Sequence, residues 1–390
     1  MNSLVRWGGL ASVPLLAVPA WMPAAWLPLV FVVVTLVIVV ATRHLTDVAG
    51  WGLVLLSGAV VIASARAPLA GSLPHMGGYA LGLVIALLTV EYGRSRSLAV
   101  FLLAGLAAVT AGLLFVRVDT FKFLPLSVTD ALPKLGQFVP FLGAEGRVNP
   151  NALSGLCLLV LPMAWAARRP AVSSTRLVQM MAWILSGLSV AALILAQSRA
   201  AWVAMGCTVV LRLCWRAIRR PQWRVPAVVT VAALAGLAGT LWWLDPREVE
   251  RVLVSGWSSI DRRWHVWEAG WAMAVAHPWG GVGLDQFRAL YVPPPGSAPG
   301  FDVAHAHNFP LQLVLDVGLM GTVGYLVLLV RTIRVPATCE LRPAIVTALV
   351  AVHLFGLFDA LALGTKIGVF QWWIMAIAWS HVFQSRQGIR

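Results

Sequence analysis

Charged residues are scarce in this sequence, and their scarcity excludes a soluble protein. Only 11% of the 390 residues are charged and 59% are hydrophobic, and the mean hydropathy is +0.83. Most side chains must therefore face lipid or other helices. The sequence also lacks internal repeats, low-complexity tracts, heptad runs, and Walker or dinucleotide-binding motifs. One membrane domain, residues 1–390, is expected to carry any chemistry.

Cysteine is also rare, and the four cysteines are not placed to form disulfides. Cys157, Cys207 and Cys214 fall in apolar runs, and Cys339 falls in a short basic connection. None of these positions is expected to face an oxidising compartment, so we expect no disulfide bond.

Long apolar runs are abundant. They recur about twelve times at the length of about 17 to 25 residues that crosses a bilayer as a helix, which predicts an all-α polytopic membrane protein. The first run contains several prolines and could be a signal peptide, but we favour a span because no clear cleavage site follows. The expected spans are 7–20, 24–41, 51–65, 76–91, 97–117, 149–167, 177–197, 200–217, 225–243, 308–330, 342–359 and 366–384.

The arginines indicate how these spans are oriented. A cytoplasmic N-terminus places most arginine-bearing connections on the inner side, as the positive-inside rule requires. Both termini are then inside, and two long connections, 118–148 and 244–307, are outside. This topology also explains most of the net charge of +14, and the dispersed basic residues do not indicate a nucleic-acid partner. The inner arginines are Arg43, Arg94, Arg96, Arg168, Arg169, Arg176, Arg216, Arg219, Arg220, Arg224, Arg331, Arg334, Arg342, Arg386 and Arg390.

Arg199 is not explained by this rule, because it lies at the outer end of a hairpin between two spans. A charge at this depth is costly without a partner. The side chain could reach up to lipid phosphate. Alternatively, it could be a fixed cation for an anionic ligand, since the planar guanidinium suits phosphate oxygens.

The second outer connection contains a predicted helix over about residues 261–276. Tryptophans form a stripe along one face of this helix. Such a stripe is more typical of a packing face, or of a helix that lies along the outer leaflet, than of a ligand pocket. On that placement Arg263 lies at headgroup depth, in the same region as Arg199. The segment that follows, 277–301, is rich in proline and glycine and predicts a partly ordered lid. The stripe consists of Trp264, Trp267, Trp271 and Val275.

The tenth expected span begins directly after HAHN, residues 305–308. Asn308 or His307 can cap the helix, and Pro310 is tolerated in its first turn. The positive end of the helix dipole disfavours imidazolium and attracts phosphate, so a neutral His307 would be a usable general base. His307 could equally serve only as a cap that hydrogen-bonds the loop.

Small and polar residues continue into this span. Gly318, Gly321 and Gly324 recur at every third position, which predicts the close approach of another helix. Asp316 is expected to hydrogen-bond a neighbouring helix, although acids within the membrane are functional candidates by default.

Three segments together carry a family signature: QSRAAW at 197–202, RWHVWEAGW through HPWGGVGLDQF at 263–287, and AHNFPLQLVLDVGLMGTVGYL at 306–326. The set resembles the O-antigen ligase and polymerase superfamily. GRVNPNALSGLCLL at 146–159 is similar to a segment that opens a span in many members. The likeness is strongest over residues 146–330, and its specificity comes from the order and spacing of the motifs around one large outer loop.

The resemblance implies a glycosyltransferase of the bacterial inner membrane with a periplasmic active site. Members transfer a glycan from undecaprenyl pyrophosphate to a lipid A-core sugar, to another repeat unit or, in some relatives, to a protein hydroxyl. It further implies that Arg199 and Arg263 contact the donor pyrophosphate and that His307 activates the acceptor. Ala200 stands where many members have glycine, which affects the local turn. Secondary candidates are His305, Asn308, His265, Arg288 and Arg147.

The residues and the resemblance indicate the same chemistry. Two arginines can receive charge as the pyrophosphate leaves, and a base can take the acceptor's proton. We therefore expect one inverting displacement without a metal or another cofactor. An alternative interpretation places a divalent cation on His305, His307 and Asp302.

We expect an O-antigen ligase that acts on lipid A-core, because the chain length, the number of spans and the single large outer loop suit that branch. A polysaccharide polymerase is the alternative. A protein O-oligosaccharyltransferase is less expected, because such relatives often carry additional C-terminal sequence. A transporter for an anionic lipid would also need outer arginines, but no inverted repeat is visible. The sequence does not predict the oligomeric state.

Overall fold

A computed structural model describes residues 48–66, 69–115, 148–173, 175–244, 246–293, 303–360 and 363–386. Within these ranges the chain forms helices and no β-strand. The expected spans 7–20 and 24–41, and all but the last residue of the connection 118–148, lie outside the described residues. The helices are α3 (Val48–Arg66), α4 (Leu69–Tyr92), α5 (Arg94–Phe115), α7 (Pro150–Ala167), α8 (Arg176–Ala196), α9 (Arg199–Arg219), η7 (Pro221–Trp223), α10 (Arg224–Leu244), α11 (Pro246–Ala276), α12 (Phe287–Leu290), α13 (Phe309–Ile333), α14 (Arg342–Gly356) and α15 (Lys366–Arg386).

The helices follow the apolar runs of the sequence. Each expected span from 51–65 onward coincides with one helix, although α4 begins at Leu69 rather than near residue 76. Hydropathy and length therefore identified these helices, and the described part of the chain is all-helical, as expected of a membrane protein. The total of about twelve spans stays a prediction. Five described helices are long and apolar enough to cross a membrane: Arg94–Leu114, Pro150–Ala167, Arg176–Ala196, Arg199–Arg219 and Phe309–Ile333.

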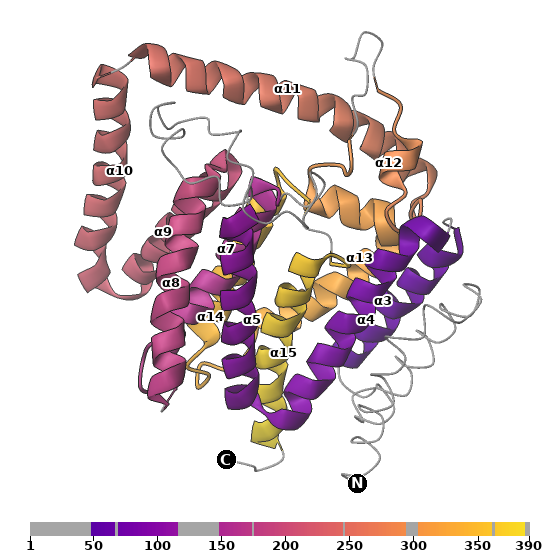
Figure 1. Ribbon diagram of the computed structural model, residues 1–390, viewed down its shortest axis with the longest axis horizontal. Coiled ribbons are helices and arrows are strands. Elements are labelled where there is room, and N and C mark those ends of the chain that lie inside the picture. Colours follow the sequence, from indigo (N-terminus) through magenta and orange to yellow (C-terminus); the bar gives the residue numbers. More distant parts are fainter. Residues whose placement is uncertain are drawn as a thin grey trace.

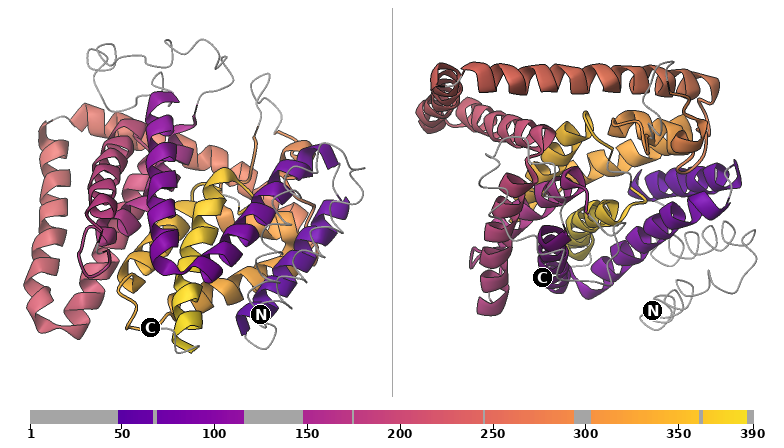
Figure 2. Two further views of the ribbon diagram at one scale, coloured as in Figure 1. Left: turned by 60° about the horizontal axis from the view of Figure 1, so that its bottom comes forward. Right: turned by 45° about the horizontal axis from the view of Figure 1, so that its top comes forward.

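Successive helices run in alternating directions, so their ends gather at two opposite ends of the bundle (Figures 1 and 2). The long helix α11 lies across one of these ends, where it contacts α10 and α13 (Figure 1). We call this the α11 end. The other end carries Arg94, Arg168 and Arg216 at or near helix termini, and we call it the basic end.

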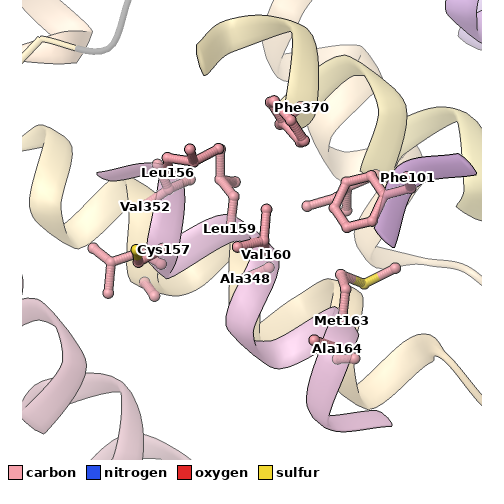
Figure 3. Close-up of a cluster of buried hydrophobic side chains, with 14 of the residues drawn as sticks. Phe101, Leu156, Cys157, Leu159, Val160, Met163, Ala164, Ala348, Val352 and Phe370 are labelled. Carbon is pink, nitrogen blue, oxygen red and sulfur yellow. The ribbon is translucent and has the colours of Figure 1, made fainter. Parts of the chain in front are cut away.

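The largest core lies around α7, which packs against α8 and α14. Its side chains are buried and hydrophobic, and Leu159, Val160 and Met163 are fully buried (Figure 3). Phe101 from α5 and Phe370 from α15 meet at 5.6 Å between ring centroids. This packing joins α5, α7 and α8 to the C-terminal helices α14 and α15.

Glycines bring α3 and α13 together. A Cβ at Gly324 would lie 2.7 Å from the backbone nitrogen of Leu56, and one at Gly321 would lie 2.9 Å from the Cβ of Ala59. The predicted close approach of another helix is therefore confirmed for these two residues.

Gly318 has a different role from the one predicted. It has a φ of 66° and breaks the helical conformation inside α13, and a Cβ there would lie 2.1 Å from the carbonyl oxygen of Trp279. The loop after α11 enters this break: Leu319 N–H donates to Pro278 O at 2.8 Å, and Val282 N–H donates to Leu315 O at 2.7 Å. The prediction of helix packing at Gly318 was thus wrong, because a loop satisfies the backbone groups that the break frees.

Helix α11 extends the predicted helix 261–276 towards its N-terminus, beginning at Pro246. Its inward face carries Val266, Gly270 and Ala274, which are buried, and Gly270 lets Leu311 of α13 approach closely. Trp264, Trp271 and Val275 face outward. The exposed stripe is compatible with the predicted position along a leaflet, which stays a prediction.

Candidate functional site at the α11 end

Two histidines and one aspartate meet where α13 begins and α14 ends. The Nε2 atom of His305 lies 2.9 Å from Oδ1 of Asp359, and the Nδ1 atom of His307 lies 3.5 Å from the same oxygen. The two imidazole rings are 4.4 Å apart between centroids. Asp359 is buried, whereas both histidine side chains are partly exposed.

The backbone before α13 is held by its own side chains. Asn308 is the N-cap: its side chain accepts a hydrogen bond from Leu311 N–H at 3.0 Å and donates one to Leu357 O at 3.2 Å. This confirms a cap at this position and assigns it to Asn308 rather than His307. His307 adopts a left-handed φ of 49°, a conformation that is uncommon for residues other than glycine.

Further hydrogen bonds fix the histidine segment to its surroundings. The indole N–H of Trp267 donates to His307 O at 3.4 Å, and the backbone N–H of Ala306 donates to the side chain of Gln312 at 2.8 Å. Trp267 thus joins α11 to the segment, while its neighbours in the tryptophan stripe face outward. A left-handed residue inside such a network is typical of functional sites.

Asp359 is ionised in this environment. Burial by itself would raise the pKa of the Asp359 carboxyl, but the hydrogen bond with His305 and the nearby imidazole of His307 outweigh burial and hold the pKa below its ordinary range. The backbone N–H of Ala360 also donates to Oδ1, at 2.8 Å. His307 Nδ1 faces this carboxylate at 3.5 Å, which favours a proton on Nδ1 and leaves Nε2 as the basic nitrogen of that ring.

Arg199 lies at the first position of α9, at the same end of the bundle. The turn before it is made by Gln197, which has a left-handed φ of 46°, and by Ser198, whose hydroxyl accepts from Ala201 N–H at 3.4 Å. The turn does not need glycine at position 200, where this chain has Ala200, because Gln197 supplies the left-handed residue.

Arg263 of α11 is near both Arg199 and Asp359. Burial lowers the pKa of the Arg263 guanidinium, the Asp359 carboxylate raises it, and the positive charges of Arg199 and Arg262 lower it. The side chain is half-buried. The guanidinium groups of Arg199 and Arg263 and the Asp359 carboxylate therefore act on each other beneath α11, whereas Arg262 is exposed on that helix. The excess positive charge of the two arginines over the one carboxylate attracts an anion such as a phosphate.

Not every sequence candidate belongs to this cluster. His265 is exposed on α11 and lies 3.9 Å from Glu268, one helical turn away; it does not join the other histidines, because it is on the outward face of α11. Arg288 is exposed on α12. Arg147 and Asp302 lie outside the described residues.

Sequence reasoning missed Asp359. The signal was available, because Asp359 ends the expected span 342–359 and the predicted topology places that end on the same side as His307. It also missed a second pair, in which Nδ1 of His75 on α4 lies 3.7 Å from the carboxylate of Asp285. The charge of His305 acts on His75, so this pair borders the cluster.

Asp316 supports the loop beside this pair. Its buried carboxylate accepts from the side chain of Gln312 at 2.8 Å and from the backbone N–H of Asp285 at 3.3 Å. The prediction of a bond to a neighbouring helix was therefore wrong, because the partners are a residue of the same helix and the loop that enters its break.

The ligand atoms of the two histidines and Asp359 indicate whether this cluster could bind a metal ion. His305, His307 and Asp359 each offer one ligand atom, and these atoms lie within 4.8 Å of one another. Imidazole nitrogens and a carboxylate oxygen suit zinc. Asp359 thus takes the place that the sequence interpretation gave to Asp302, whereas the nearby charge of Arg263 opposes a divalent cation.

A comparison with known protein families finds a match over the part of the chain that contains most of this site. Residues 184–326 match the family model described as O-Antigen ligase, which confirms the resemblance to the ligase and polymerase superfamily without distinguishing its branches. The matched segment contains Arg199, Arg263 and His307. The search of curated proteins gives no match.

Proposed function

We propose that this chain, whose residues 184–326 match the O-antigen ligase family, is an O-antigen ligase of the bacterial inner membrane. It transfers a glycan from undecaprenyl pyrophosphate to lipid A-core at the periplasmic face. The observation that supports the proposal is the convergence of Arg199, Arg263 and His307 at one end of the bundle, although they lie far apart in sequence. A ligase needs this combination, because a pyrophosphate must be bound beside a base.

The two arginines act on the donor. Their guanidinium groups hold the pyrophosphate oxygens and receive negative charge as the bond between the anomeric carbon and the phosphate oxygen breaks. Planar guanidinium groups make paired hydrogen bonds to phosphate oxygens, which a lysine cannot reproduce. The excess positive charge beneath α11 therefore stabilises the leaving group.

His307 acts on the acceptor. The acceptor hydroxyl oxygen attacks the anomeric carbon, its proton passes to Nε2 of His307, and undecaprenyl pyrophosphate leaves with the bonding electron pair. A positioned base contributes about 10²- to 10⁴-fold to such a step. Asp359 holds Nδ1 of the ring and stabilises the imidazolium that forms, as in other carboxylate–histidine pairs.

The reaction is expected to invert the anomeric configuration. A single displacement places the base opposite the leaving group, and a retaining mechanism needs a free carboxylate as nucleophile. The buried Asp359 carboxylate is engaged by two histidines and is not free for that role. No metal takes part, because the arginines supply the positive charge.

The test is a transfer assay with purified protein, undecaprenyl-pyrophosphate glycan and lipid A-core in detergent. His307→Ala should lower the rate by at least about 10²-fold. His265→Ala is the matched control, because His265 is exposed on the outward face of α11 and its loss should leave the rate unchanged. A folded His307→Ala protein with the wild-type rate would remove the base assignment.

The same assay separates a ligase from a polymerase. Lipid A-core and free donor repeat units are supplied together, and the product is analysed for which acceptor has been extended. Extension of lipid A-core supports the ligase, whereas longer undecaprenyl-linked glycans support the polymerase. Movement of the donor across a membrane without any transfer would instead favour a transporter.

A further inference from the structure

At the basic end of the bundle, we propose a binding site for a phospholipid that carries two phosphate groups, of the cardiolipin class. The site is formed by four arginines at the inner ends of α7 and α9, which we call the arginine cluster: Arg168, Arg169, Arg212 and Arg216. The predicted orientation places it at the inner leaflet. It lies at the opposite end of the bundle from the candidate active site and is independent of the transfer reaction.

Arg168 is held in place by two tryptophans. Its guanidinium carbon lies 3.2 Å from the ring centroid of Trp165 and 3.9 Å from that of Trp183, and its Nε–H donates to Trp165 O at 3.3 Å. Face-on contacts with aromatic rings stabilise a guanidinium without using the N–H groups at its edge. A side chain fixed in this way loses little entropy when it binds a phosphate.

Arg212 is fixed by hydrogen bonds to a neighbouring helix. It extends from α9 to α14, where it donates to Pro343 O and to the Thr347 hydroxyl. The positive charges of Arg216 and Arg169 both act on Arg212, so the arginines of α9 and of the α7 end share one region. The positive-inside rule explains why arginines are here, but it does not require their fixed and mutually repelling arrangement.

Charge complementarity identifies the headgroup. Among the described residues, the ion pairs of the chain involve none of the four arginines, and the electrostatic effects on Arg168 and Arg212 come from other arginines. Basic pockets between membrane helices on the cytoplasmic side bind such anionic headgroups. The cluster consists of two pairs of arginines, one at the end of α7 and one on α9. Each pair can bind one phosphate, so the cluster suits a headgroup with two phosphates better than a headgroup with one.

The surface beside the cluster suits acyl chains. Trp165 and Trp183 are 54% and 61% exposed, and tryptophan is enriched where headgroups meet hydrocarbon. From Trp183 an exposed apolar strip follows α8 away from the basic end and includes Ile184, Val190 and Ile194. The arginine cluster and this strip therefore present a charged and an apolar surface in the order that a phospholipid requires.

The experiment measures lipid binding to the full-length purified protein by native mass spectrometry in detergent. Cardiolipin should bind more tightly than phosphatidylglycerol, which has one phosphate, and phosphatidylcholine should bind most weakly. Arg168→Gln with Arg169→Gln should weaken cardiolipin binding by about 30-fold, since each arginine near anionic lipid contributes about 1 kcal/mol, or about fivefold. Arg96→Gln with Arg334→Gln is the control, because it removes the same charge from exposed positions outside the cluster and should weaken binding less than threefold.

Trp183→Leu is a second variant that keeps all four charges. It removes one ring from the stack on Arg168 and should weaken cardiolipin binding several-fold while phosphatidylcholine binding stays unchanged.

Equal losses in the cluster variant and its control would mean general attraction between charges and would overturn the site. Equal affinities for cardiolipin and phosphatidylglycerol would overturn the two-phosphate assignment. Glycan transfer by each variant in detergent serves as the check that it is folded.

Discussion

His305 and Asp359 are 54 positions apart in sequence, yet Nε2 of the histidine lies 2.9 Å from Oδ1 of the aspartate. The contact joins the segment before α13 to the turn after α14. It places an ionised carboxylate beneath His307 as well, 3.5 Å from its Nδ1 atom. One buried acid thereby orients both histidines of the candidate site.

Replacing Asp359 with Asn should impair transfer while the fold is retained. The amide has nearly the same shape but cannot stabilise an imidazolium by charge, so kcat should fall by about 10²- to 10⁴-fold with a much smaller change in KM. Steady-state kinetics of the purified protein measure this. Asp261→Asn, at an exposed position of α11, is the control, and a kcat within threefold of wild type for Asp359→Asn would contradict the role.

Replacing Arg199 or Arg263 with Lys should slow transfer by about tenfold or more. Lysine keeps the positive charge but loses the paired hydrogen bonds that a guanidinium makes to phosphate oxygens. Arg262→Lys is the matched control, because Arg262 neighbours Arg263 in sequence and is exposed. Wild-type rates for both site variants would exclude a pyrophosphate contact of this kind.

Removing divalent cations should leave transfer unchanged. The proposed mechanism takes its positive charge from arginines, so EDTA should not lower the rate. Added Zn²⁺ should inhibit, because His305, His307 and Asp359 present three ligand atoms close together and a bound ion would occupy the base. Loss of activity in EDTA and its recovery with a metal would contradict the metal-independent mechanism.

Gly318→Ala should destabilise the protein by at least about 2 kcal/mol, through left-handed strain of order 1–3 kcal/mol and a clash with the carbonyl of Trp279. The loop that carries Asp285 would shift with it. Gly187→Ala in α8 is the control, because no atom lies within 4 Å of its added Cβ and alanine favours a helix. Thermal unfolding followed by size-exclusion chromatography compares the two, and equal melting temperatures would mean that the break in α13 relaxes without cost.

The sequence allowed the helices to be predicted because a bilayer constrains length and composition at once. Apolar runs marked α3, α5, α7, α8, α9 and α13 to within a few residues, and the arginines gave an orientation in which Arg199, Arg263 and His307 share one side. Their role as site residues was implied by a family resemblance and stays a prediction, while the structure brings Arg199 and Arg263 into one electrostatic group with Asp359.

What the sequence by itself determined was the local part of the protein: which segments are helices, and that one of them is capped at His307 or Asn308, because these depend on neighbours a few residues away. Tertiary structure alone decided that Asp359 meets His305 and His307, that Trp267 faces inward while the rest of its stripe does not, and that a loop enters α13 at Gly318. Each of these depends on which helices pack side by side, and hydropathy does not specify that, since every apolar helix can pack against lipid or against another helix.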